Sequence, residues 1–454
     1  MRNLLFFLFF TSALTFSQYT VDATFLPNVT SDWAILYKVE GVKKNYIDNV
    51  KIKKDTLFVE GEKKIIGKVK FLLPSHTKSG VYRLTYKLEG DAFVDFIFNK
   101  EQISFGLHPD YPEQTIVFTK SEENKLYQNY LTEIANAQQE LDSIQIIQIK
   151  NPSLNQQSVY KKALQAVKNI QNSYIEASKG KYVQPFIRAT SKVNSDTIQI
   201  SGQEYMQNIT ANFFNNINFK NKTLLNSSFL VDRIVDYVFY LNISNEEKIQ
   251  QQLYKKSVAI VLSKISEIHL KAAVVKFLIQ EFSEIKNTVM VDYLFENYFD
   301  KLPETLQSKS FKEKQLKELV TELGRKAPNF FWKENGEKKS LTTLNSSEYY
   351  LLVFWSTRCS HCMNEIPKLY RFLKDKSNIK TIAFSLEKDD LVWKKMQKQL
   401  PNWHHVLGLH KWENKVARQY NINATPTYFI LDKNKVIVKK PTHLKDVKEY
   451  INSM

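Results

Sequence analysis

The residue pattern changes character twice along the 454-residue chain, and this limits the folds that it can adopt. From residue 18 to about 119, short alternating or apolar runs are separated by glycines, which is typical of a β-sandwich. From 120 to about 320, glycine and proline are scarce and apolar residues recur at helical spacing, as in AAVVKFLIQEF. From 321 to 454, strand and helix patterns alternate, which predicts an α/β layer. We therefore expect a multidomain chain with these three parts in this order.

The last part can be divided into elements. We expect a mixed sheet whose strands alternate with helices and close in a hairpin. The predicted elements are a strand at Tyr349–Phe354, a helix ending near Lys374, a strand at Ile379–Leu386, a helix from Asp389 to Gln399, a short strand near Val406, a helix at Trp412–Tyr420, a hairpin turning at Asp432–Asn434 and a helix from Leu444.

The first 17 residues have the layout of a secretory signal peptide. Arg2 is followed by the apolar block Leu4–Phe10, and the small residues Thr15 and Ser17 precede an expected cleavage site. No later segment offers about 18 uncharged apolar residues, the length that a membrane span requires. We therefore expect an exported protein, soluble in the periplasm or cell envelope. The alternative is a buried N-terminal strand or helix.

The formal net charge is +17, but the lysines are spread along the whole chain. This favours a solvated basic surface over nucleic-acid binding. Because 43% of the residues are hydrophobic, the chain can form a large core without a disulfide scaffold. The long helical part is expected to bury its apolar stripes between helices, with a ligand groove as the alternative.

Cys359 and Cys362 are the only two cysteines, and they lie in the stretch FWSTRCSHCMNEIP. Three chemistries are open to such a pair: a metal clip, a structural disulfide and a redox couple. Export favours disulfides, but so short a loop would restrain the unfolded chain little. Zinc usually requires four ligands, and the further candidates are His404, His405 and His410, of which His404 and His405 are otherwise expected in a loop. A working redox couple is the interpretation that we carry forward, with no metal and no cofactor.

Position in the chain supports this interpretation. Cys359 is predicted at the start of a helix that follows a buried strand, where the helix dipole and free N–H groups favour an anion. The pKa of its thiol should therefore fall, and the thiolate is the attacking species. Arg358 and His361 are expected to act in the same direction. Cys362, one turn further on, is close enough to attack a mixed disulfide on Cys359.

Three segments together carry a family resemblance. GRKAPNF at 324–330, the cysteine stretch at 354–367 and NATPTYF at 423–429 resemble thioredoxin-fold oxidoreductases of the exported TlpA/ResA-like group. The resemblance spans about 323–454. The first part of the chain, through GVYRLTY at 80–86 and the stretch after it, resembles a β domain of exported Bacteroidetes proteins of this kind.

The resemblance implies roles for individual residues. Cys359 would be the nucleophile and Cys362 the resolving thiol, the two forming a disulfide when oxidised. Thr425–Pro426 corresponds to the cis-proline of the family, with Pro426 packed against the cysteines and the Thr425 backbone binding a substrate strand. Pro367 would kink the helix that carries the cysteines.

Some positions depart from the family pattern. Arg358 stands where a tryptophan is common, and Trp355 is kept as a supporting residue. The strand position that carries a buried acid in thioredoxin is Val353, which cannot transfer protons. Glu387, after the next strand, is the substitute that we expect, and an exposed loop acid is the alternative.

The predicted function is thiol-disulfide exchange with protein thiols or disulfides of the cell envelope, together with an upstream membrane thiol donor or acceptor. The family resemblance suggests a reductant, whereas Arg358 and His361 would stabilise the reduced form and make the pair more oxidising. The alternative function is an envelope protein that binds a partner or surface through its first two parts, with an accessory thioredoxin domain.

Overall fold

The computed structural model describes residues 18–27, 29–59, 61–87 and 92–454. The signal peptide expected at residues 1–17 lies outside this range. Contacts group the chain into two compact units, Met1–Glu267 and Ile268–Met454. This division by packing falls within the helical part of the chain, and the domain limits near residues 120 and 320 stay predictions.

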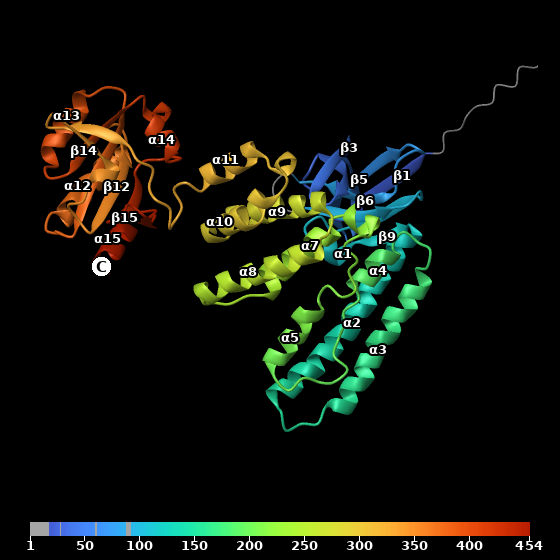
Figure 1. Cartoon of the computed structure of the whole chain (residues 1–454). Helices are drawn as coiled ribbons and strands as arrows, with labels where there is room; N and C mark the ends of the chain where they lie inside the picture. The colour runs from blue at the N-terminus through green and yellow to red at the C-terminus, as the bar shows by residue number, and fades with distance from the viewer. Residues whose placement is uncertain (1–17, 28, 60, 88–91) are drawn as a thin grey trace, which may run out of the picture. The chain divides into compact units, whose positions relative to one another are not determined.

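The N-terminal part of the first unit consists of two sheets that share one core (Figure 1). One sheet has the strand order β4-β5-β1-β8-β9 and the other β3-β2-β6-β7. Phe25 and Phe71 from the first sheet pack in the same cluster as Leu36 and Tyr82 from the second, which confirms the predicted sandwich. The strands are β1 (Tyr19–Phe25), β2 (Trp33–Glu40), β3 (Lys43–Lys51), β4 (Lys53–Val59), β5 (Glu62–Leu73), β6 (Gly80–Thr85), β7 (Phe93–Phe98), β8 (Ile103–Leu107) and β9 (Val117–Lys120).

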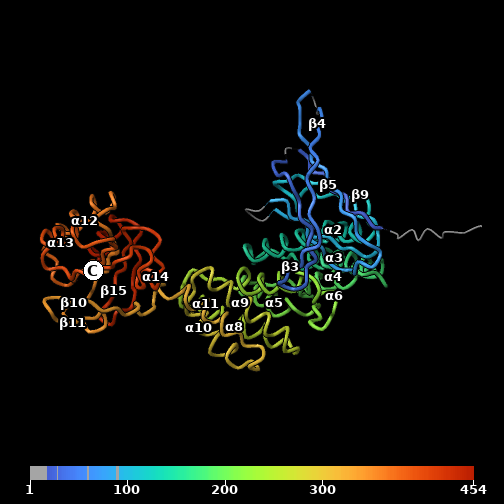
Figure 2. Tube along the Cα trace, turned by 90° about the horizontal axis from the view of Figure 1, so that it is seen from above, coloured from blue at the N-terminus to red at the C-terminus, as the bar shows by residue number. Residues whose placement is uncertain are grey.

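Alternation of side chains explains why these segments are strands. In the second half of β5, Val69, Phe71 and Leu73 are buried while Lys70 and Leu72 are exposed. Successive side chains of a strand point to opposite faces, so this pattern gives the sheet one inner face. The β4–β5 hairpin extends away from the core of this unit (Figure 2).

Helices follow the sandwich within the first unit. The amide of Asn124, in the first turn of α2, bonds to the backbone of Ile97 in both directions, at 2.8 and 2.6 Å, and so attaches α2 to β7. The long helices α2 and α3 pack side by side (Figure 1). The helical segments are α1 (Pro112–Thr115), α2 (Glu122–Lys150), α3 (Gln157–Ala177), α4 (Gln184–Thr190), α5 (Gly202–Asn212), α6 (Lys222–Leu225), α7 (Phe229–Val235), the π-helical η1 (Asp236–Leu241) and α8 (Glu247–Lys264).

The second unit consists of helices followed by an α/β layer. Its main sheet has the order β14-β13-β12-β15-β16, in which β12, β13 and β14 run parallel and β15 and β16 form the closing antiparallel hairpin. The elements are α9 (Ile268–Glu284), α10 (Thr288–Asn297), η2 (Phe299–Lys301), η3 (Glu304–Leu306), α11 (Lys309–Glu318), β10 (Phe331–Glu334), β11 (Glu337–Ser340), η4 (Leu341–Thr343), β12 (Tyr349–Trp355), α12 (Ser360–Leu373), β13 (Ile379–Glu387), α13 (Leu391–Gln399), β14 (His404–Leu409), η5 (Lys411–Glu413), α14 (Lys415–Gln419), β15 (Thr427–Asp432), β16 (Ile437–Lys439) and α15 (Leu444–Asn452).

The central strand β12 is buried on both faces, as expected for a strand in a parallel sheet. Val353 and Trp355 face the cluster that contains Cys362 and the apolar side of α12. Phe354 faces the opposite cluster, with Tyr420 from the end of α14. β12 therefore places α12, and the cysteines at its start, firmly on one face of the sheet. In the described part of the chain, no helix combines the length and the apolar character that a membrane span needs.

Candidate active site

Cys359 stands at the N-terminal end of α12, directly after the loop that follows β12. Its sulfur accepts a hydrogen bond from the backbone N–H of Cys362 at 3.2 Å. Cys359 is partly exposed, whereas Cys362 is buried, and both are free thiols in this structure. The structure thus brings together the two sulfurs that the sequence singles out, one reachable and one covered. Their disulfide stays a prediction.

The two thiols have opposite pKa shifts. Burial raises the pKa of Cys359, but hydrogen bonds from the Cys362 thiol, the Cys362 backbone N–H and the Thr425 hydroxyl outweigh it, so that this pKa lies below its ordinary value. Burial, and after it the hydrogen bond to Cys359, raises the pKa of Cys362 to about 12. Cys359 is therefore the thiol that ionises first.

His361 acts on the pKa of Cys359 in the expected direction, and the expected contribution of Arg358 stays a prediction. Arg358 donates to the Oδ2 atom of Asp389 at 2.7 Å, and both side chains are exposed to solvent. His361 lowers the pKa of Cys359 through its backbone N–H, while its side chain is exposed. The pKa of Cys359 is lowered by hydrogen bonds from Cys362 and His361, in the first turn of α12, and from Thr425.

The segment before β15 lies beside the cysteines. The peptide bond between Thr425 and Pro426 is cis, as the resemblance predicts. The Cys359 thiol donates to the carbonyl of Thr425 at 3.3 Å, and Thr425 and Pro426 are both half-buried. A backbone acceptor thus adjoins the reachable sulfur at the protein surface. The substrate-binding role of these two residues stays a prediction.

Glu387 ends strand β13 and is only 1% exposed, which corrects the alternative of an exposed loop acid. Its Oε1 accepts from the Thr357 backbone N–H and from the Ser385 hydroxyl, both at 2.6 Å. Its Oε2 accepts from the Thr357 hydroxyl at 2.9 Å. Because Thr357 lies two residues before Cys359, this carboxylate holds the loop that leads into the active-site helix.

Trp355 is fully buried in the cluster that contains Cys362. Its indole N–H has no hydrogen-bond partner among the described residues. The ring of Trp355, at the end of β12, packs in the same apolar cluster as Cys362 and does not reach solvent. In this conformation Trp355 therefore cannot contact a substrate.

A second acid near the cysteines was not predicted. The Tyr428 hydroxyl, on β15, donates to Oε2 of Glu365, on α12, at 2.7 Å. Burial and then this carboxylate raise the pKa of Tyr428, and the two cysteine thiols are among the groups that raise it further. A signal was present in the sequence: Glu365 follows Cys362 by three residues, a spacing that shares one helix face, and Tyr428 follows Pro426 by two.

The histidines considered for a metal are engaged elsewhere. His404 and His405 lie in β14 and not in a loop, which corrects that expectation. His404 contacts the Glu334 carboxylate at 3.0 Å, and His405 bonds to the Leu400 carbonyl at 2.8 Å. Within the residues that the structure describes, no three His, Cys, Asp or Glu side chains gather as metal ligands would.

This chain is similar in sequence to known thioredoxin-like proteins. A sequence profile described as thioredoxin-like matches residues 347–437. A thiol-disulfide oxidoreductase ResA of Bacillus cereus is 29% identical over 123 residues, which cover 26% of this chain and 69% of that protein. The thioredoxin-like protein YneN of Bacillus subtilis is 31% identical over 126 residues, covering 27% of this chain and 72% of that protein.

Solved structures are also similar. A domain of a possible thiol-disulfide isomerase from Cytophaga hutchinsonii is 31% identical, covers 29% of this chain and 91% of its own, and has a TM-score of 0.26. The profile match extends from the segment before β12 to the start of β16, and so includes both cysteines and the cis-proline segment. The chain therefore belongs to the thioredoxin-like family, as a TlpA/ResA-like thiol-disulfide oxidoreductase.

Proposed function

We propose that this chain exchanges disulfides with protein thiols outside the cytoplasm, with Cys359 as the nucleophile and Cys362 as the resolving thiol. The observation that carries the proposal is the contrast between the sulfurs: one is partly exposed with a lowered pKa, the other is buried with a raised pKa. A reachable thiolate backed by a covered thiol can do both halves of an exchange.

In the reducing direction, the Cys359 thiolate attacks one sulfur of a substrate disulfide. A mixed disulfide forms, and the other substrate sulfur leaves as a thiolate that takes up a proton. Cys362 then loses its proton and attacks the Cys359 sulfur, which releases the second substrate thiol. Two electrons pass to the substrate and the Cys359–Cys362 disulfide forms; oxidation of a dithiol substrate is the reverse.

Thr425 is proposed to bind the substrate. Its carbonyl accepts the hydrogen of the Cys359 thiol at 3.3 Å. Once that thiol has ionised, the carbonyl loses this donor and can accept an N–H from an extended substrate chain. Glu387 is proposed as a positioning residue, because it holds Thr357 in the preceding loop.

The cellular setting is part of the proposal. The layout of residues 1–17 supports export to the periplasm or cell envelope, where the partners would be protein thiols or disulfides and a membrane thiol donor or acceptor. The direction of electron flow depends on how strongly the reduced form is stabilised. Hydrogen bonds to Cys359 stabilise its thiolate, which favours an oxidising pair.

Insulin reduction tests the activity. The full chain should reduce insulin disulfides in the presence of a thiol donor, and Cys359→Ser should abolish the reaction. Equal, negligible rates for both proteins would refute the proposal and favour an envelope-binding protein with an accessory thioredoxin domain.

A trapping experiment tests the partners. Cys362→Ser removes the resolving thiol, so mixed disulfides on Cys359 should accumulate when the chain is exposed to envelope proteins. The double variant Cys359→Ser/Cys362→Ser is the control. If the single variant captures no more protein through disulfides than the double variant, the proposed protein substrates are wrong.

A further inference from the structure

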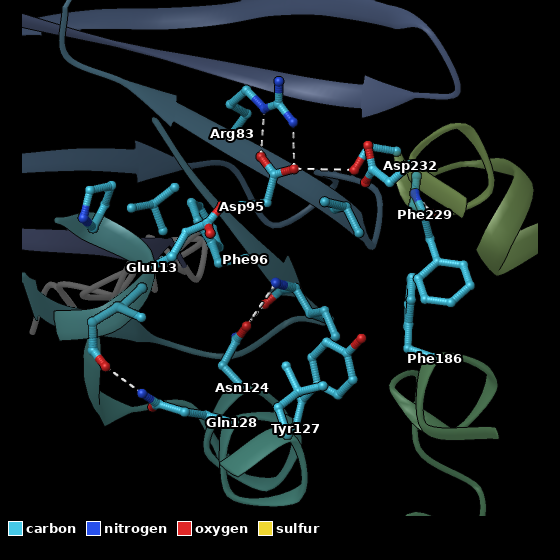
Figure 3. Close-up of a pocket in the computed structure, with 18 of the residues that line it drawn as sticks. Arg83, Asp95, Phe96, Glu113, Asn124, Tyr127, Gln128, Phe186, Phe229 and Asp232 are labelled. Atoms are coloured by element: carbon cyan, nitrogen blue, oxygen red, sulfur yellow. Dashed lines mark hydrogen bonds and ion pairs between the residues drawn. The ribbon is translucent and has the colours of Figure 1, made fainter. Parts of the chain in front are cut away.

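A cavity of about 730 Å³ lies within the first unit, between the face of β6 and β7 and the helices α1, α2, α4 and α7 (Figure 3). Its volume falls in the range of about 300–1,000 Å³ that small-molecule sites occupy. Its lining residues all belong to the first unit, whereas Cys359 and Cys362 belong to the second. What the cavity can bind depends on which of its polar groups already have partners.

The charged side chains on the sheet face, Arg83 and Asp95, form an ion pair with each other. Arg83 donates to Asp95 through two nitrogens, at 2.6 and 2.7 Å, and its guanidinium lies 3.6 Å from the ring centre of Phe93. The Ser228 hydroxyl also donates to Asp95, at 3.2 Å. This charge pair carries no net charge toward a ligand.

The polar groups on the helices are engaged as well. The Asn124 amide bonds the backbone of Ile97, and the Tyr127 hydroxyl pairs with the Thr190 hydroxyl at 3.2 Å. Arg233 forms an ion pair with Asp236 at 2.5 Å. Its Nε atom is buried and has no partner in the described structure, and its guanidinium lies 5.8 Å from the ring centre of Phe229.

Two carboxylates remain. Asp232 on α7 and Glu113 on α1 line the cavity and form no ion pair with a described residue. Desolvation raises the pKa of Asp232, and the neighbouring charge of Asp95 raises it further, while Ser228, Arg83 and Arg233 act in the opposite direction. Both carboxylates are exposed to solvent at the edge of the cavity, and they are the lining charges that stand outside the Arg83–Asp95 and Arg233–Asp236 pairs.

Aromatic rings form the wall next to Asp232. Tyr127, Phe186 and Phe229 come from α2, α4 and α7, and their ring centres follow each other at 6.1 and 5.8 Å (Figure 3). Aromatic faces attract organic cations, and they also cover the apolar part of a ligand.

We propose that this cavity binds an organic cation, an ammonium or guanidinium group on an apolar or aromatic body, with Asp232 as its counter-ion and the Tyr127–Phe186–Phe229 rings as its apolar wall. Glu113, on α1 at the opposite side of Figure 3 from Asp232, adds to the negative potential. The cation would form an ion pair with the carboxylate of Asp232, and the apolar body of the ligand would displace water from the three rings.

Calorimetric titration of the full chain tests the proposal with three probes of similar shape: phenethylamine, neutral 2-phenylethanol and anionic 3-phenylpropionate. We expect saturable binding of the amine only. Asp232→Asn should weaken it about tenfold, the order of one contact with an unpaired charge near a protein surface. Glu140→Gln, which removes an exposed carboxylate from α2 outside the cavity, should leave it unchanged.

The same titration on Cys359→Ser separates this site from the redox site, since the amine should bind this variant as it binds the wild type. Phe229→Leu should weaken the amine by shortening the aromatic wall. The proposal is overturned if the anion or the alcohol binds as well as the amine, if the amine does not saturate, or if Asp232→Asn and Glu140→Gln behave alike.

Discussion

At the scale of single residues, Cys359 and Cys362 share one helical turn but have different surroundings. Cys359 is partly exposed to solvent, and its sulfur accepts a hydrogen bond from the Cys362 N–H in the first turn of α12. Cys362 packs against Trp355 and Ile366 in an apolar cluster. N–H donors stabilise a thiolate, and apolar neighbours stabilise a thiol. The proposed order of attack in the exchange follows from this difference.

The lowered pKa of Cys359 predicts a pH profile. In the reduced chain, iodoacetamide should alkylate Cys359 with a midpoint below about 8.5, the value of a free cysteine, because only the thiolate reacts. Cys362 should remain unlabelled through this range, since burial raises its pKa to about 12. Peptide mass mapping distinguishes the two. A midpoint at or above the free value, or earlier labelling of Cys362, would contradict the account.

Glu387 predicts a loss of stability. Glu387→Ala leaves the Thr357 N–H and the buried Ser385 hydroxyl without their acceptor. Each unsatisfied buried group costs about 1–3 kcal/mol, so the loss of both hydrogen bonds should lower the free energy of unfolding by about 2–6 kcal/mol. Glu387→Gln retains an acceptor and should lose less. Denaturant unfolding measures both changes, with the exposed Asp375→Ala as control. A loss no greater than that of Asp375→Ala would contradict the anchoring role.

At the scale of elements, local patterns are enough to place the frame of the site. Apolar runs mark β12 and β13, which the structure extends by one residue each beyond the predicted ends. The stretch that holds the cysteines begins α12 at Ser360, because Cys359 acts as its N-cap. Periodicity and capping are short-range signals, so a single sequence carries them.

Contacts between elements that are distant in the chain could not be predicted from the sequence. Tyr428 and Glu365 are 63 residues apart, and their hydrogen bond exists only because β15 lies beside β12 and α12 covers that face. The burial of Glu387 depends in the same way on the register of β13 against β12. The cation site proposed in the first unit joins β6, β7, α1, α2, α4 and α7, and its net charge depends on which of its charged side chains form ion pairs.

The link between β15 and α12 predicts a measurable effect. Tyr428→Phe removes the donor to Glu365 and should lower the free energy of unfolding by about 1.5–3 kcal/mol, as expected for a hydrogen bond to a charged acceptor. Tyr349→Phe is the matched control, because the Tyr349 hydroxyl has no hydrogen bond in the described structure and its loss should change the stability by less than about 0.5 kcal/mol. Equal effects of the two substitutions would show that the link does not stabilise the fold.

At the scale of the whole molecule, contacts gather within two units, and each unit carries its own site. The redox pair belongs to the second unit, at the start of α12. The aromatic cavity belongs to the first, on the face of β6 and β7. One chain therefore offers a thiol chemistry and a separate candidate binding site.

Two units predict two unfolding transitions in calorimetry, because chains with several domains depart from two-state behaviour. Asp95→Asn deprives Arg83, which is only 9% exposed, of its carboxylate and should destabilise the first unit by about 2–3 kcal/mol, less than a fully buried pair since Asp95 is partly exposed. Glu387→Ala should shift the other transition. A single transition moved equally by both substitutions would contradict this division.

The central claim is that Cys359 and Cys362 form a reversible redox couple. Equilibration of the full chain in thiol–disulfide buffers of graded potential, followed by acid quenching and peptide mapping, tests it directly. The account predicts one two-electron transition, between a form with two free thiols and a form with a Cys359–Cys362 disulfide, and its midpoint decides whether the chain reduces or oxidises its partners. Cysteines that stay unpaired at every potential, or that form disulfides only between chains, would contradict it.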